Sequence, residues 1–209
     1  MTAFSKQQEI ILSALAAGYR VTFRYDWTGF FSIEWPCGIS TVVYKKIDDT
    51  FWCHPKGVYG LERKSMLPAS DFFTFGDYAL ERGWNRAKVS LKPEHVALAE
   101  TVRAERLAKP LTAAVRDALL VAGGPGIMQW SGDGAYCGYR YCVAPDLVEA
   151  KNASRQFLAP AIEALAERDW LLPIDRIESG YDVDGVYRLN GAGMDALAMV
   201  VARTRKVAA

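Results

Sequence analysis

The hydrophobic positions near the N-terminus first follow a helical spacing and then alternate with polar ones. The helical positions are Ile10, Ile11, Ala14 and Leu15. Gly18 follows them, where a left-handed residue ends many helices. The alternating positions are Val21, Phe23 and Tyr25, then Phe31, Ile33 and Trp35 after a Thr28-Gly29 turn. Alternation on both sides of a turn is typical of a β-hairpin, so the pattern predicts a helix followed by a hairpin.

The same order of patterns returns near the middle of the chain. A second helical set is followed by Gly123 and by another stretch rich in glycine and aromatic residues. Its apolar positions are Val115, Ala118, Leu119 and Ala122. An offset of 105 positions places Leu15 on Leu120, Gly18 on Gly123 and Cys37 on Cys142. Ordered self-similarity of this kind predicts a repeated module, and Gly123 is expected to end its helix as Gly18 does.

Two further matches follow in the same order along the chain. "YALERGW" (residues 78–84) parallels "ALAERDW" (residues 164–170), and we interpret each as a helix end that closes on Glu-Arg-x-Trp. This match places Trp84 over Trp170. Residues 89–106 then parallel residues 187–204, each predicting a strand, a polar turn and a final helix. The sequence therefore predicts an α+β protein made of two copies, domains 1–107 and 108–209.

A helix, a short strand, two helices and two strands is the element order of the winged helix-turn-helix family. "ALERGWNRAKVSLKPEHVAL" resembles the family's third helix, which typically ends in Leu-x-x-Arg-Gly, with the wing and next strand. Residues 164–197 resemble the pattern more closely, because Tyr187-Arg188-Leu189-Asn190-Gly191 matches the last strand and the helix cap after it. The resemblance implies tandem duplicated winged-helix-like domains. Each copy departs from the family by an extended β-hairpin insertion after its first helix.

Membership of this family would imply DNA binding through the third helix of each copy. In the first copy, "SDFFTFGDYALER" offers Asp71 and Asp77 where a DNA reader presents Arg, Asn or Gln to base edges. In the second copy, polar and basic residues gather at the expected helix start, although Pro160 would kink or restart the helix. The predicted DNA-binding residues are Lys151, Asn152, Ser154, Arg155 and Gln156, with Arg188 on the wing strand.

Aromatic residues of the hairpins suggest a different function. A two-stranded ribbon points alternate side chains to opposite faces, so its aromatic residues cannot all be buried. We expect Trp27, Phe30 and Tyr139 to be exposed. Exposed tyrosine and tryptophan side chains are enriched at protein interfaces. The second hypothesis is therefore an adaptor or inhibitor that binds a protein partner through its hairpins.

The overall charge does not decide between these hypotheses. The chain has 25 Lys and Arg residues against 24 Asp and Glu, a net charge of +1. Such a balance provides no bulk attraction to nucleic acid or to an anionic membrane, so phosphate binding needs a local basic patch. One basic series interleaved with aromatic residues comprises Lys45, Lys46, Lys56, Arg63 and Lys64. It could contact nucleic acid or form an ordinary solvated loop surface.

Other functional classes find little support in the sequence. Cys37, Cys53, Cys137 and Cys142 lack the paired spacing of zinc knuckles, so we predict packing roles and no metal site. The glycines around Gly124 follow a helix instead of preceding one, the reverse of a phosphate-binding loop. With only two histidines and no catalytic motif, we expect no enzymatic activity and no cofactor.

The apolar stretches are too short to predict a membrane segment. Residues 192–202 are interrupted by Asp195 and fall short of the ~20 residues that cross a bilayer. The N-terminus shows no basic region followed by an apolar one. We therefore expect a cytoplasmic protein with reduced cysteines and no contact with a membrane.

Overall fold

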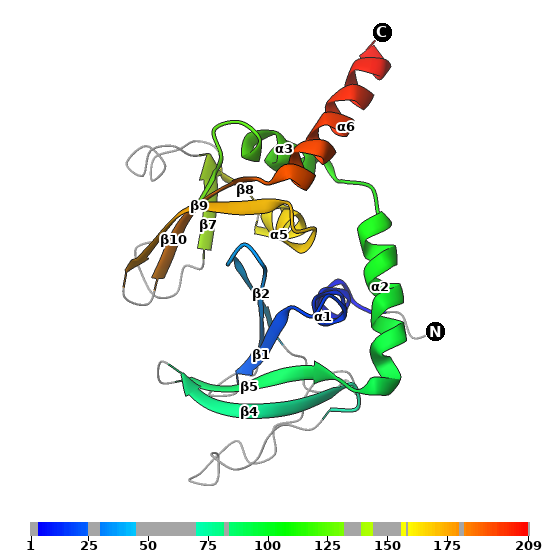
Figure 1. Cartoon of the computed structure of the whole chain (residues 1–209), viewed down its shortest axis with the longest axis vertical. Coiled ribbons are helices and arrows are strands. Elements are labelled where there is room, and N and C mark those ends of the chain that lie inside the picture. The colour runs from blue at the N-terminus through cyan, green and yellow to red at the C-terminus, as the bar shows by residue number, and fades with distance from the viewer. Residues whose placement is uncertain are drawn as a thin grey trace. The chain divides into compact units, whose positions relative to one another are not determined.

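The computed structural model describes residues 4–24, 30–44, 70–81, 84–131, 139–143, 156–157, 159–179 and 182–208. Its contacts divide the chain into two compact units. Unit 1 comprises Met1–Trp35 and Ser40–Lys109, and unit 2 comprises Pro36–Ile39 and Pro110–Ala209. Each unit combines helices with a five-stranded antiparallel sheet (Figure 1). This confirms the predicted α+β class.

Unit 1 starts with the predicted helix and hairpin. Helix α1 (Lys6–Ala16) begins with a capping box, in which the Ser5 hydroxyl accepts from the Gln8 N–H and the Gln8 side chain accepts from the Ser5 N–H. Gly18 follows the helix with φ +73°, the left-handed conformation that the sequence predicts. The strands are β1 (Arg20–Arg24), β2 (Phe30–Glu34), β3 (Ser40–Tyr44), β4 (Phe73–Glu81) and β5 (Trp84–Leu91). A 3₁₀ turn, η2 (Pro93–His95), leads into helix α2 (Val96–Ala108).

The core of unit 1 lies between its sheet and its two helices. Helix α1 packs against α2 and against β1 and β2 (Figure 1). The β1–β2 register places Val21 opposite Ile33 and Phe23 opposite Phe31, and these four side chains are buried. Alternation along each strand thus directs the apolar residues toward the helices and the polar residues to the other face. That second face is called the outer face below.

Unit 2 repeats this arrangement, with three helices among its described residues. Its elements are α3 (Ala113–Ala122), β6 (Ile127–Ser131), β7 (Tyr139–Val143), β8 (Gln156–Phe157), α5 (Ala159–Glu167), β9 (Leu171–Ser179), β10 (Asp182–Leu189) and α6 (Gly191–Ala208). Helix α3 is capped by the Thr112 hydroxyl, which accepts from the Val115 N–H. The Asn190 side chain accepts from the Gly193 N–H at the start of α6. Helix α3 packs against α5, α6, β6 and β10.

The strand order is the same in both sheets. It reads β3-β2-β1-β5-β4 in unit 1 and β8-β7-β6-β10-β9 in unit 2. Strands β4 and β9 both have nine residues, and β5 and β10 both have eight. The β4–β5 and β9–β10 hairpins are related by one sequence offset of 98 positions, so that Phe73 corresponds to Leu171 and Leu91 corresponds to Leu189. The two units therefore share one topology, and their origin by duplication stays a prediction, as do the independent domains 1–107 and 108–209.

The shared topology corrects one sequence match. Trp84 begins β5, whereas Trp170 precedes β9, which is the counterpart of β4. The match between "YALERGW" and "ALAERDW" is therefore wrong, although the second segment does lie at the end of helix α5. Residues 78–81 lie in strand β4 and not at a helix end. Cross-strand pairing of Phe73 with Leu91 and of Phe75 with Val89 favours the strand over the local helix preference of Ala-Leu-Glu.

The end of helix α3 also differs from its prediction. Gly123 has φ −79°, a right-handed conformation, and the positive φ of +104° is found at Gly126. Glycine at position 123 has a packing reason, because an added Cβ would collide with the Leu197 side chain on α6. Gly18 and Gly123 occupy corresponding positions in the repeat, but different constraints favour glycine at each.

Candidate nucleic-acid interface

Most of the DNA-binding residues predicted for unit 2 lie outside the described residues. These are Lys151, Asn152, Ser154 and Arg155. Gln156 is described and lies in strand β8, where it pairs with Cys142, so its assignment to a recognition helix is wrong. Helix α5 begins only at Ala159, with Pro160 in its first turn. Proline is tolerated there because the first N–H groups of a helix have no partner within it, which agrees with the predicted restart at this residue.

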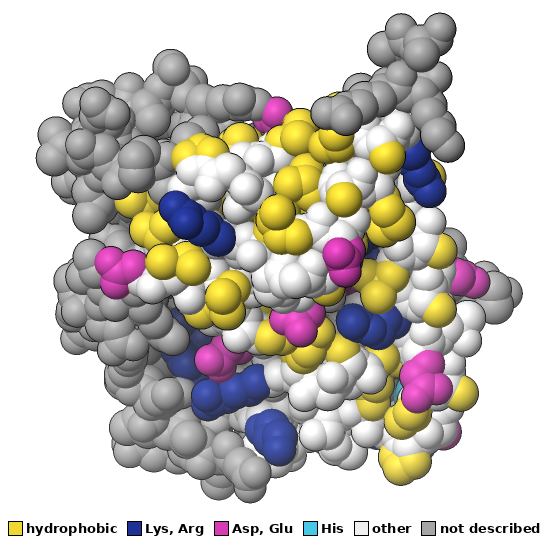
Figure 2. Space-filling view, turned by 45° about the horizontal axis from the view of Figure 1, so that its top comes forward, with side chains coloured by type: hydrophobic (Ala, Val, Ile, Leu, Met, Phe, Trp, Pro, Cys, Tyr) yellow, Lys and Arg dark blue, Asp and Glu magenta, His cyan; other side chains and the backbone are white. Residues whose placement is uncertain are grey.

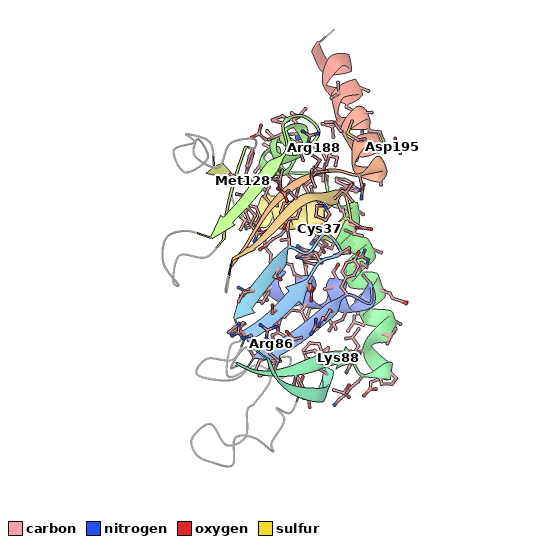
Figure 3. The ribbon with its side chains drawn as sticks, turned by 60° about the vertical axis from the view of Figure 1, so that its left-hand side comes forward. Cys37, Arg86, Lys88, Met128, Arg188 and Asp195 are labelled. Atoms are coloured by element: carbon pink, nitrogen blue, oxygen red, sulfur yellow. The ribbon has the colours of Figure 1, made fainter. Side chains whose placement is uncertain are left out.

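Arg188 is one of two basic residues in the β9–β10 hairpin, and the other is Arg176 on β9. Arg188 is exposed on β10 opposite Leu172 of β9, whose own relative exposure is 49% (Figure 3). The acidic residues of the same hairpin are Asp175, Glu178, Asp182 and Asp184. Two cations on a hairpin with four acidic residues provide a weak attraction for phosphate. Arg188 therefore provides little support for DNA binding by this wing.

The predicted partner-binding aromatics are described only in part. Trp27 and the side chain of Tyr139 lie outside the described residues, so the protein-partner hypothesis stays a prediction. Phe30 begins β2 and is half-exposed, with the Arg24 guanidinium 4.9 Å from the centre of its ring. Trp35 is buried, and its Nε1 donates to the Thr41 hydroxyl at 2.7 Å. Phe30 is thus part of a mixed aromatic and basic surface.

That surface follows from the pairing of β1 with β5. Phe23 and Ala87 form a buried inner pair, so their neighbours along the two strands face outward. Arg24 lies directly opposite Arg86, and Thr22 lies directly opposite Lys88. Directly opposed Cβ atoms are about 4.5–5.5 Å apart. Three cations from two strands therefore occupy adjacent positions on the outer face, with Arg86 and Lys88 following one another along β5 (Figure 3).

Two rows of paired residues extend the surface across the sheet. The first row joins Phe30 to Arg24 and Arg86, and the second joins Ser32 to Thr22, Lys88 and Gly76. We call these seven residues the basic face. A Cβ added to Gly76 would meet nothing within 4 Å, so the backbone at Gly76 is open to approach. The basic face combines positive charge, one aromatic ring and small residues, of which Gly76 is exposed and Thr22 is buried.

The acidic residues near the basic face lie beside its two rows, and one of them, Asp77, lies in the β4 bulge between Gly76 and Ala79. Neither row contains an acidic residue among the paired positions that the structure describes. Glu34 lies one pair further along and forms an exposed ion pair with Arg20 at 3.4 Å, so that corner is neutral. The Nε and Nη2 atoms of Arg24 and the Nε atom of Arg86 are buried.

Figure 2 shows Lys and Arg side chains in several regions of the described surface, including its lower part, where Asp and Glu side chains lie beside them. The sequence analysis missed the basic face because Arg24 and Arg86 are far apart in the chain. The alternation of Arg86 and Lys88 with Ala87 and Val89 was the available signal.

The described part of the chain does not support a metal site or a reactive thiol. Cys37 is buried, and burial raises the pKa of its thiol to about 11, which keeps it protonated and unreactive at neutral pH. No group of His, Cys, Asp and Glu in the described ranges could hold a metal ion. Cys53 and Cys137 lie outside these ranges.

Comparisons of this chain with models of known protein families, with curated proteins and with solved structures gave no match. The winged-helix resemblance therefore stays a prediction. Among the described helices, none has the length and apolar character needed to span a bilayer.

Proposed function

We propose that this chain binds nucleic acid, without catalysing a reaction on it, through the basic face of unit 1. The observation that carries the proposal is the direct opposition of Arg24 and Arg86, with Lys88 in the adjacent row. Guanidinium groups donate two parallel hydrogen bonds to a phosphate, and two such groups side by side suit neighbouring phosphates of one backbone. The site differs from the one expected in unit 2, but the class of ligand is the same as in the first hypothesis.

The nearly neutral composition is compatible with this function. A net charge of +1 excludes a strong field around the whole chain, so binding depends on the local patch. We therefore expect affinity typical of nonspecific contacts, with a Kd on the order of 10⁻⁴–10⁻⁶ M at physiological salt. Affinity should rise steeply as salt is removed, since each phosphate contact releases condensed counterions.

A titration of labelled DNA by fluorescence anisotropy at several salt concentrations tests the proposal. Replacing both arginines in the variant Arg24→Gln/Arg86→Gln should weaken binding and lower the log–log salt slope by about 0.7–0.9 for each lost contact. The matched control is Arg188→Gln, which removes an exposed cation from unit 2 and should leave both quantities unchanged. Circular dichroism checks that each variant keeps its fold.

Two results would contradict the proposal. The first is wild-type protein that does not bind DNA or RNA at low salt. The second is binding that persists in the double variant and is lost in Arg188→Gln, because this would place the phosphate contacts on the β9–β10 hairpin of unit 2.

A further inference from the structure

We infer that two copies of this chain associate through helix α6 of unit 2, with the two helices antiparallel. This inference goes beyond the proposed function, because none of its residues belongs to the basic face. The exposure of α6 is the first observation. In the part of the helix whose side chains the structure describes, residues 191–203, only Gly193 and Ala196 are buried. The end of α6 extends away from the sheet and from the other helices of unit 2 (Figure 1).

The exposed side chains of α6 are mostly apolar, which is unusual for a solvated helix face. Met199 is 59% exposed and Met194 is 46% exposed, and Ala198 and Ala202 are exposed beside them. Met199 is the most exposed large hydrophobic residue in the described part of the chain. A surface helix normally directs polar side chains to solvent, whereas a helix that is apolar around its whole circumference is buried. Helix α6 therefore has the composition of a helix with a further partner.

The equivalent helix of unit 1 shows that the fold does not require this apolar surface. The offset of 98 positions that relates the two hairpins places Glu100 of α2 on Ala198 and Thr101 of α2 on Met199. Glu100 and Thr101 are polar and exposed. Helix α2 thus packs against α1 and directs polar residues to solvent, whereas α6 presents apolar residues at the corresponding positions. The apolar surface is specific to unit 2, and packing within one unit does not account for it.

The charges of α6 favour a second copy of the chain as the partner. Asp195 and Arg203 are the only charged residues among positions 191–203, and both are exposed. Neither forms an ion pair within the part of the chain that the structure describes. They lie four positions before and four positions after Met199, so the three side chains share one face of the helix. This spacing makes the face complementary to itself.

A two-fold axis at Met199 brings the opposite charges together. When a second α6 runs antiparallel to the first, the two Met199 side chains meet, and each Asp195 lies opposite the Arg203 of the other copy. Homodimers usually have two-fold symmetry, in which one surface contacts itself. Packed helices lie about 8–10 Å apart, a separation that Met and Ala side chains can fill. A parallel pair would instead place like charges opposite each other, which is unfavourable.

Sedimentation velocity of the full chain, over concentrations from micromolar to millimolar, tests the inference. We expect a dimer that forms only as the concentration rises, because a contact along a single helix is small. Met199→Glu places a carboxylate at the two-fold axis, where it meets the same group of the second copy, and should weaken the association at least about tenfold. The matched control is Ile174→Glu on β9, which changes a side chain of similar exposure, 55%, and should leave the association unchanged.

Charge exchange tests the antiparallel register. Asp195→Arg alone and Arg203→Asp alone each place like charges opposite one another at both ion pairs, and each should weaken the association about five- to thirtyfold. A mixture of these two variants has opposite charges at both positions again, so it should form a heterodimer with an affinity close to that of the wild type. The combined variant Asp195→Arg/Arg203→Asp should also associate like the wild type. Melting temperatures check that every variant keeps its fold.

Three results would overturn the inference. The first is a wild-type chain that stays monomeric at every concentration, which would leave the apolar surface of α6 to a different occupant. The second is a dimer that Ile174→Glu weakens and Met199→Glu does not, which would place the contact on β9. The third is a mixture of the two single charge variants that associates no better than each variant alone.

The inference and the proposed function can fail separately. None of the three results bears on nucleic-acid binding by unit 1, which is measured with a different ligand and different variants. Absence of nucleic-acid binding would in turn leave the association through α6 in place. If Met199→Glu fails to fold, the mixture of the two charge variants still decides the question.

Discussion

The two sheets have the same strand order but different outer faces. In unit 1, Thr22 on β1 lies opposite Lys88 on β5, and both residues belong to the outer face. The corresponding pair in unit 2 is Met128 on β6 opposite Val186 on β10. Met128 and its counterpart Thr22 are both buried, whereas Lys88 is exposed (Figure 3). At these two positions the first sheet has a polar and a basic residue, and the second sheet has two apolar residues.

The contrast continues at the next outward pair. Arg24 lies opposite Arg86 in unit 1. The same step along β6 and β10 reaches Trp130 and Asp184, so unit 2 has an aromatic and an acidic residue at the corresponding positions. Inward residues fix the strand pairing, and outward residues can then differ without changing the topology. Function therefore follows the outward positions, and the shared fold alone does not assign one function to both units.

The inner faces differ too, although both are buried. The central inner pair is Phe23 opposite Ala87 in unit 1 and Gln129 opposite Gly185 in unit 2. The Tyr187 hydroxyl donates to Gln129 Oε1 at 3.1 Å, and a Cβ at Gly185 would lie 2.8 Å from that hydroxyl. Unit 1 thus fills its core with packed rings, whereas unit 2 buries a satisfied polar pair above a glycine.

The largest expected effect separates the inner from the outer face of unit 1. Phe23→Ala removes a fully buried ring that contacts Phe31 and Phe75. It should lower the free energy of unfolding by about 3–5 kcal/mol. The control Phe30→Ala loses a half-exposed ring and its contact with Arg24, which costs on the order of 1 kcal/mol. Chemical denaturation measures both, and equal costs would show that the two faces are not distinguished as described.

A smaller effect is expected in the polar core of unit 2. Tyr187→Phe keeps the ring but leaves Gln129 Oε1 without the hydrogen bond from this hydroxyl. The unmet acceptor should lower the free energy of unfolding by about 1–3 kcal/mol. Tyr19→Phe is the matched control in unit 1, where the Tyr19 ring contacts Trp35 and Arg103, and it should change stability by less than about 0.5 kcal/mol. A Tyr187→Phe variant as stable as the control would contradict the polar pair.

Sequence patterns predict the elements whose signals are local. The capped helix α1, the hairpin of β1 and β2, and the strand–turn–helix ends of both units agree with the structure because each depends on neighbouring residues. The sequence predicts a helix at the end of strand β4, because Ala79-Leu80-Glu81 has a helical preference that pairing with β5 overrides. Local sequence patterns do not predict the pairing of β4 with β5.

The candidate site was harder to predict than the fold. Arg24 and Arg86 meet only because β5 pairs with β1 instead of with a sequence neighbour of β1. The basic and polar residues from Lys151 to Gln156 are adjacent in sequence and so suggest one site, yet Gln156 belongs to a strand. To predict a cluster of residues that spans several strands, one needs the strand order. Hydrophobic alternation does not give that order.

The most direct test of the basic face is photo-crosslinking of the wild-type chain to a labelled oligothymidylate, followed by mass spectrometry of the attached peptides. We predict that nucleotides attach to peptides from β1, β2 and β5, including the one that contains Phe30. These attachments should disappear in Arg24→Gln/Arg86→Gln. Attachment confined to residues 110–209 would contradict the account and would favour a site in unit 2 around Lys151 and Arg155.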